Sequence, residues 1–211
     1  MFGYDKFRAA IIDTETNGLK PTDSVLSVRT LELEMFINPA EGLVKMFATD
    51  LIQQYYNYRQ GEAVNPHALA VHQLTPERIV ELRAAHNQAP DVCPFFEDAQ
   101  LELHNYLLQR SLIVGHNISF DLRMIHLENP LVPVFCTMKD PRDYYKSVSP
   151  EPIKSSVGLA RAADLCNVLY NKESKHDATV DTFVTAKVFQ HVLDNNKAMV
   201  MRLYNMMNNG A

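Results

Sequence analysis

The chain has 211 residues, of which 46% are apolar, and a formal net charge of −5 at pH 7. This size suits one compact domain, and no run approaches the roughly 20 apolar residues that a membrane-spanning helix requires. The negative charge argues against a protein that wraps DNA with a basic surface, although a nuclease that holds a few nucleotides at a metal site can be acidic, because cations match its carboxylates.

The predicted elements begin with strands. Residues 7–12 (FRAAII) form a short apolar run that ends abruptly in a polar turn, which is typical of a buried strand, and we expect Asp13 at the C-terminal end of that strand. Residues 24–37 alternate roughly between apolar and polar side chains, which predicts one long strand or two strands with a tight connection.

Helices then alternate with strands. The predicted elements are a helix within residues 93–110, a strand at 111–115, a helix from about residue 118, a strand at 132–137, and helices at 157–169 and 178–193. This order indicates an α/β fold in which a mixed β-sheet is flanked by α-helices, in a single domain.

The three cysteines, Cys93, Cys136 and Cys166, are an odd number without a CxxC pair. They predict neither a disulfide framework nor a zinc knuckle, and a reducing compartment suits them. The first ten residues also lack the basic-then-apolar layout of a secretion signal. We therefore expect a cytoplasmic protein that works at the nucleoid, or a nuclear one in a eukaryotic host.

Acidic residues follow two of the predicted strands. Asp13 and Glu15 are two apart, so in an extended segment both carboxylates project to one face, with origins about 6.6 Å apart, and can hold the same metal ion. Such a pair also occurs by chance on solvated loops, but ligands collect beyond the carboxyl ends of strands in open α/β sheets, which favours a site. Asp121 would lie in the first turns of a helix, where the helix dipole alone can explain an acid.

A fourth acid, Asp181, shares the apolar stripe of its predicted helix with Val184 and Val188. A carboxylate directed at a core is costly unless a cation or hydrogen-bond donors receive it, so either a metal ion or a buried salt bridge is expected there. His176 precedes Asp181 by five residues, about 140° around a continuous helix. The two can serve one site only if His176 lies in the loop before the helix.

Together these residues make the sequence resemble the DnaQ-like 3′–5′ exonucleases of the DEDDh type, with wording closest to the exodeoxyribonuclease X branch. The motifs are IIDTETNGL, VGHNISFDLRMI and HDATVD, and similarity in VNPHALAVHQLT and FCTMKD extends the resemblance over residues 8–193. It implies an RNase H-like fold with an exonuclease domain at residues 1–195, followed by a C-terminal tail or helix extension at 196–211.

The resemblance also implies a hydrolysis that uses two Mg²⁺ or Mn²⁺ ions on either side of the scissile phosphate. Asp13 would bridge both ions. Glu15 and Asp181 would hold the ion that carries the attacking water, and Asp121 would hold the ion at the leaving 3′ oxygen. His176 would take the proton of the water, and the product would be a nucleoside 5′-monophosphate.

For the substrate, the resemblance implies contacts from Thr16, Asn17, Gly18, Leu19, Asn117 and Phe120. Leu19 would wedge beside the terminal base, and Gly18 would permit close approach of the backbone. Asn117 and Phe120 would position the last two nucleotides, although Phe120 can equally be part of the core. The tyrosines of residues 55–58 can stack on bases, but packing is the more common role of such side chains.

Three functions stay open: a DNA exonuclease of repair or turnover, an RNA exonuclease with the same chemistry, and a proofreading or adaptor subunit that binds a DNA polymerase. The five motif residues argue against a purely structural module, because binding alone would not need all of them. We expect a nucleic acid 3′ end as the substrate, with DNA favoured over RNA and single-stranded or frayed ends favoured over duplex. A homodimer or a polymerase complex is the expected assembly, without a membrane.

Overall fold

A computed structural model describes residues 3–153, 155–170 and 178–209. The sheet has the strand order β3-β2-β1-β4-β5. Its strands are β1 (Asp5–Thr16), β2 (Val25–Asn38), β3 (Leu43–Tyr55), β4 (Leu112–Gly115) and β5 (Val134–Cys136). The first three pair antiparallel, whereas β4 and β5 run parallel to β1. The predicted mixed sheet is therefore confirmed.

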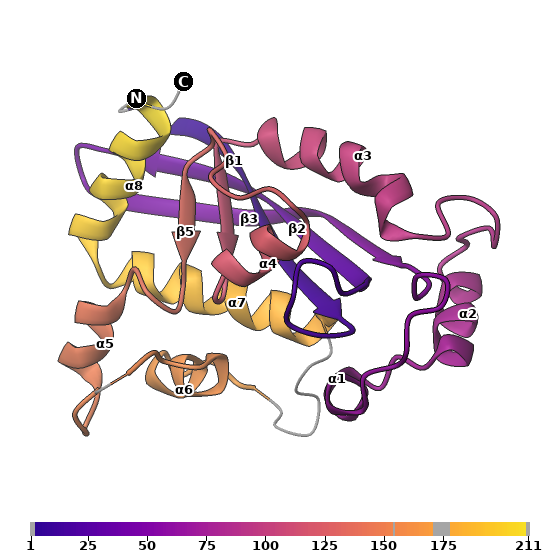
Figure 1. The fold of residues 1–211 in the computed structure, drawn as a ribbon. Coiled ribbons are helices and arrows are strands. Elements are labelled where there is room, and N and C mark those ends of the chain that lie inside the picture. Colours follow the sequence, from indigo (N-terminus) through magenta and orange to yellow (C-terminus); the bar gives the residue numbers. More distant parts are fainter. Residues whose placement is uncertain (1–2, 154, 171–177, 210–211) are drawn as a thin grey trace.

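Helices cover both faces of this sheet (Figure 1). They are α1 (Pro66–His72), α2 (Pro76–Ala85), α3 (Phe96–Leu108), α4 (Ser119–Met124), α5 (Arg142–Val148), α6 (Leu159–Leu165), α7 (Ala178–Asp194) and α8 (Lys197–Asn209). One core cluster joins β1 and β4 to α3 and α4. A second cluster, on the other face, joins β1 and β2 to α6, α7 and α8. No helix among the described residues is long and apolar enough to cross a membrane.

The first strand is longer than predicted, so Asp13 lies within β1 and not at its end. The apolar run stops at Ile12, but pairing with β2 continues through Asp13 and reaches a register shift only between Glu15 and Thr16. Ladder hydrogen bonds join backbone groups, so they continue where the side chains become polar. Both acids thereby sit on a paired strand, which fixes the direction of their side chains.

The second strand is a single one, and it returns as β3 through a short turn. The side-chain Oδ1 of Asn38 accepts hydrogen bonds from the backbone N–H groups of Ala40 (3.1 Å) and Glu41 (3.3 Å). Gly42 then adopts φ +63°, a conformation that favours glycine. The sequence did not predict β3, because this edge strand is exposed along most of its length and lacks a clear apolar period.

The C-terminal residues form a helix that packs onto the core. Met199, Val200, Leu203 and Met207 of α8 are buried in the same cluster as the apolar residues of α7. The tail of the chain is thus part of the core of the domain. Helix α6, earlier in the chain, is shorter than the predicted 157–169.

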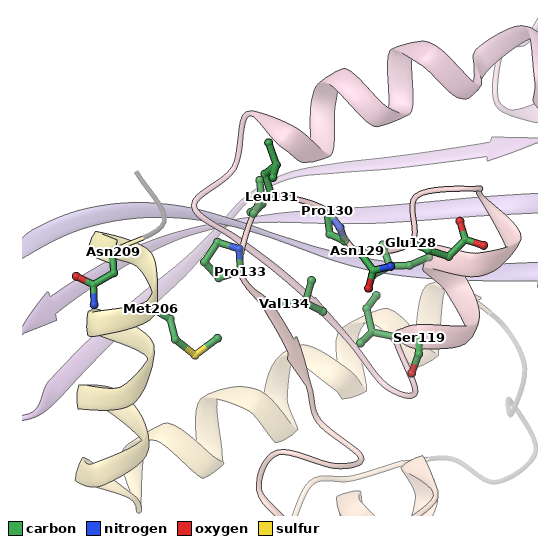
Figure 2. Close-up of a pocket in the computed structure, with 12 residues that line it drawn as sticks. Ser119, Glu128, Asn129, Pro130, Leu131, Pro133, Val134, Met206 and Asn209 are labelled. Atoms are coloured by element: carbon green, nitrogen blue, oxygen red, sulfur yellow. The ribbon is translucent and has the colours of Figure 1, made fainter.

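A groove of about 800 Å³ lies beside the edge strand β5 (Figure 2). The groove is lined by Ile118, Ser119 and Leu122 at and within α4, by residues 128–134, and by Met206 and Asn209 of α8. Its lining is mostly apolar, and Leu131 is 93% exposed. None of the four predicted metal-binding acids contributes to the lining, so the groove is separate from the candidate active site.

Candidate active site

Alternation along β1 sends its polar side chains to opposite faces of the sheet. Asp13 and Glu15 continue the row of Ala9 and Ile11, which faces α7, because successive side chains of a strand alternate. On α7, Asp181 is 9% exposed and Val184 and Val188 are buried, as predicted for a shared stripe. Three of the predicted acids thus come from two elements that pack directly against each other.

Asp121 reaches the same strand from the other face of the sheet. Pairing between β1 and β4 ends at Ile11, so the backbone of Thr14 is not used by the ladder with β4. The Oδ1 atom of Asp121 accepts hydrogen bonds there from the backbone N–H of Thr14 (3.0 Å) and from its hydroxyl (2.8 Å). These two bonds fix Asp121, which is 3% exposed, beside the two acids of β1.

Gly115 allows α4 to approach β1 closely enough for these bonds. A Cβ atom at this position would lie 2.6 Å from Cδ1 of Ile118 and 3.1 Å from the carbonyl oxygen of Ile12. Cδ1 is the flexible end of the Ile118 side chain, but Cβ of Ile118 would also lie 3.1 Å away, so a larger residue would require this side chain and its neighbours to shift. Glycine at the end of β4 thus allows the chain at Ile118 to pack closely against β1.

The carboxylates repel each other in a buried environment. Burial raises the pKa of Asp13 well above its ordinary value, and the charges of Asp121, Glu15 and Asp181 raise it further, whereas Arg29 lowers it. Burial raises the pKa of Asp121 to about 7, although the hydrogen bonds from Thr14 oppose the rise. A bound cation would remove this repulsion, so the cluster has the electrostatics of a cation site.

The donor chemistry fits a hard divalent cation. All four acids offer carboxylate oxygens, which Mg²⁺ and Mn²⁺ prefer over softer ligands. Within the described part of the chain, no three histidine, cysteine, aspartate or glutamate side chains already surround one point closely enough to hold a metal. Asp121 is turned to Thr14, and Asp181 accepts a hydrogen bond of 2.5 Å from the hydroxyl of Tyr170. Binding of a cation would thus require small rotations of these side chains.

The sequence did not indicate two neighbours of the acids, Arg29 and Tyr170. Arg29 stands opposite Asp13 in the register of β1 and β2, is 3% exposed, and lies 5.8 Å from the ring centre of Phe183. Tyr170 precedes Asp181 by eleven residues and hydrogen-bonds to it. The regular alternation of residues 24–37 was a usable signal for Arg29, since a charged side chain on the apolar face of a strand needs a partner.

The turn after β1 is held by the body of the protein. Nδ2 of Asn17 donates to Oε1 of Glu62 (2.6 Å) and to the carbonyl of Ala63 (2.9 Å), while its Oδ1 accepts from the backbone N–H of Asn65 (2.8 Å). Glu62 also accepts from the backbone N–H of Ser24 (3.1 Å) and from its hydroxyl. The amide of Asn17 is 4% exposed, so its side chain braces the turn from inside.

The other residues of this turn differ sharply in exposure. Thr16 is buried, and its hydroxyl donates to the carbonyl of Gly18 (2.6 Å). A side chain at Gly18 would overlap the carboxylate of Asp23. Leu19, in contrast, is 76% exposed. The turn therefore presents one large apolar side chain to solvent from a rigid base.

The remaining predicted contacts lie on or before α4. Asn117 is exposed and adopts φ +63°, and Phe120 is half-buried, so part of its ring packs on the core and part is accessible. His176 lies outside the described residues. The tyrosines of residues 55–58 pack inside the protein: Tyr56 has no exposed surface, Tyr55 is 7% exposed, and the hydroxyl of Tyr58 donates to the carbonyl of Leu74 (2.6 Å).

Comparisons with known proteins identify the family to which the chain is similar. The RNase_T family model, described as an exonuclease, matches residues 10–189. A ribonuclease T of Shewanella denitrificans is 25% identical over 194 residues, which cover 90% of this chain and 81% of that protein. The DNA polymerase III subunit epsilon of Buchnera aphidicola is 25% identical over 193 residues, which cover 86% of this chain and 71% of that protein.

A solved structure supports the fold. The zinc-bound form of an E. coli exonuclease I–single-stranded DNA complex superposes with a TM-score of 0.61 at 17% identity, over 95% of this chain and 42% of that chain. The present chain thus spans less than half the length of exonuclease I, and the likeness concerns the RNase H-like fold. With the family model covering most of the chain, the predicted DnaQ-like resemblance is confirmed, and the protein belongs to the exonuclease family.

Proposed function

We propose that this exonuclease removes nucleotides one at a time from the 3′ end of a strand and releases nucleoside 5′-monophosphates. The observation that carries the proposal is the convergence of four acids from β1, α4 and α7, where burial, and then the charges of the other carboxylates, raise the pKa of Asp13. Such a cluster is destabilising by itself and becomes favourable when divalent cations bind to it. Cations held at this position would supply the charge that hydrolysis of a phosphodiester bond requires.

The roles proposed for the acids are those that the family resemblance implies. When bound, two Mg²⁺ or Mn²⁺ ions would supply charge stabilisation and an ionised water. Asp13, at the centre of the cluster, would hold both ions. Glu15 and Asp181 would hold one of them from the α7 face, and Asp121 would hold the other from the α4 face. The hydrogen bonds from Thr14 and Tyr170 would orient two of these carboxylates.

His176 is the proposed general base, which takes the proton of the attacking water. If so, His176→Ala should lower turnover by roughly 10²–10⁴-fold, while the affinity for metal is retained. Single-turnover hydrolysis and isothermal titration with Mn²⁺ would measure the two properties separately. A variant with a near-normal rate would assign the proton transfer to another group.

The exposed Leu19 beside the acids supports action at an end. A wedge next to the terminal base requires the last nucleotides to be unstacked, which costs a few kcal/mol from a duplex and much less from a single strand. We therefore infer a preference for single strands or frayed termini. The DNA bound in the exonuclease I structure favours DNA, while the ribonuclease T relatives make RNA the second candidate.

Matched 5′-labelled DNA and RNA oligonucleotides test this function directly. We expect a ladder that shortens from the 3′ side, slower degradation of a strand with a 3′-phosphate, and complete loss of activity in EDTA. The ratio of the two initial rates assigns the substrate class. Activity that survives EDTA, or rapid cleavage of a circular single strand, would contradict the proposal.

A further inference from the structure

Arg123 occupies a position that the proposed reaction has not yet used. It lies on α4, two residues after Asp121. Its Nη2 donates to the backbone carbonyl of Leu19 (3.3 Å), and its guanidinium lies 5.7 Å from the ring centre of Phe120. A cation thus contacts both Phe120 and the backbone of Leu19, the two residues whose side chains we expect to contact the last bases of the strand.

The guanidinium retains most of its hydrogen-bonding capacity. An arginine carries five N–H donors, and the bond to Leu19 uses one of them. The side chain is exposed, and it forms no ion pair with any carboxylate in the described part of the chain. The structural arginines differ: Arg83 donates to four backbone carbonyls, and Arg110 is bound to Glu32 at 2.7 Å.

An incoming strand needs such a group at this position. The chain is acidic overall, and the four carboxylates of the site would repel the phosphates on the 5′ side of the scissile bond. A planar guanidinium matches the geometry of a phosphate and can donate two parallel hydrogen bonds to it. The contacts with Leu19 and Phe120 orient the group before substrate arrives.

We infer that Arg123 binds a backbone phosphate on the 5′ side of the scissile bond and thereby positions the strand. The inference rests on the proposed function, because it takes the turn and α4 as the two walls of a nucleic acid cleft. The alternative is a purely structural role, in which Arg123 ties the turn to α4 through Leu19. The two roles differ in their dependence on salt and on substrate length.

Binding of a 5′-fluorescein-labelled octathymidylate, measured by anisotropy with Ca²⁺ in place of Mg²⁺, tests the phosphate contact. We expect Arg123→Gln to weaken binding roughly ten-fold. The slope of log Kd against log salt should fall by about 0.7, the value for one phosphate on a single strand. Arg123→Lys should restore the slope but only part of the affinity. Lys6→Gln is the control, since Lys6 is an exposed cation seven residues before Asp13 on the same strand.

Turnover of two substrates then separates the two roles. The p-nitrophenyl ester of thymidine 5′-monophosphate carries a base but no second phosphate, so Arg123→Gln should raise the KM of the octanucleotide several-fold more than that of the ester. Equal losses on both substrates with an unchanged salt slope would overturn the inference and assign Arg123 to bracing alone. A wild-type protein that binds the oligonucleotide with the Arg123-dependent slope, yet hydrolyses neither substrate, would refute the proposed function and leave only the contact of Arg123 with a backbone phosphate.

Discussion

Two carboxylates near the turn after β1, those of Glu62 and Asp13, have pKa values that are shifted in opposite directions. Burial of Glu62 opposes its ionisation, but hydrogen bonds from Asn17 and Ser24, together with the charge of Arg59, lower its pKa below the ordinary value. Burial and the charges of three neighbouring carboxylates raise the pKa of Asp13, against the opposing charge of Arg29. Groups of the protein itself stabilise the ionised form of Glu62, which braces the turn. The ionised form of Asp13 needs additional positive charge, such as a bound cation.

The strongest test of this contrast is Asp13→Asn. We expect the nuclease rate to fall by about 10³-fold or more, because a carboxylate that holds both ions contributes several kcal/mol to the transition state. Asp50→Asn, a change at an exposed acid of the edge strand, is the matched control. Initial rates at saturating Mg²⁺ measure the effect. An Asp13→Asn enzyme within ten-fold of the wild type would remove this residue from the reaction.

A smaller effect should appear in the stability of the metal-free protein. The pKa of Asp121 is about 7 in the folded protein, above the value of about 3.9 for an unfolded aspartate. The contribution of this group to the stability of the fold is therefore fully present only when the pH lies below the unfolded pKa. The contribution disappears as the pH rises through 7. At pH 8 in EDTA, Asp121→Asn should therefore raise the stability, by about 1–3 kcal/mol, or roughly 2–4 °C in Tm for each kcal/mol.

Thermal unfolding followed by circular dichroism at pH 5 and pH 8 provides the measurement. The gain in Tm from Asp121→Asn should shrink at pH 5, where the wild-type carboxyl is protonated in the folded state. Added Mg²⁺ should raise the Tm of the wild type more than that of the variant. A variant that melts below the wild type at pH 8 in EDTA would show that the bonds to Thr14 outweigh the cost of burying the charge of Asp121.

The smallest effect on stability is expected from a substitution of Glu62, the carboxylate with the lowered pKa. A carboxyl with a lowered folded pKa stabilises the fold above its unfolded pKa, and this contribution is lost as the pH falls through the folded value. Because Glu62 is partly exposed, solvent screening limits the cost of Glu62→Gln at pH 7 to about 0.5–1 kcal/mol. Urea unfolding at pH 7 and below pH 4 should show the difference disappearing in acid. Glu81→Gln, an exposed acid on α2, should change neither.

The parts of the site that follow a period were predictable from the sequence. Asp13 and Glu15 share a face through the two-residue period of a strand, and Asp181 shares the stripe of Val184 through the helical period. The motif order then placed Asp121 beside them. The length of β1 was underestimated, because backbone pairing continues after the apolar side chains end.

The parts that depend on long-range pairing were not predictable. Arg29 meets Asp13 only through the register of two strands, and Asn17 meets Glu62 across 45 residues of sequence. Asn17 was expected to contact the nucleotide from its place in the turn, yet its amide is engaged inside the protein. The local sequence pattern indicates whether a segment forms a helix or a strand and which of its faces is buried. The partner of a polar side chain depends instead on which distant segment packs against it.

The contribution of α7 has a consequence for when the protein becomes active. Asp13 enters the sheet with the first strand, but Asp181 belongs to a helix that begins at Ala178 and packs across β1 and β2. A chain still being synthesised, or one in which α7 has not docked, lacks one of the four proposed metal ligands. Nucleic acid near the ribosome would therefore meet a polypeptide without this ligand until the residues from Ala178 onward have emerged and folded. Hydrolysis would therefore begin only after α7 has packed onto the sheet.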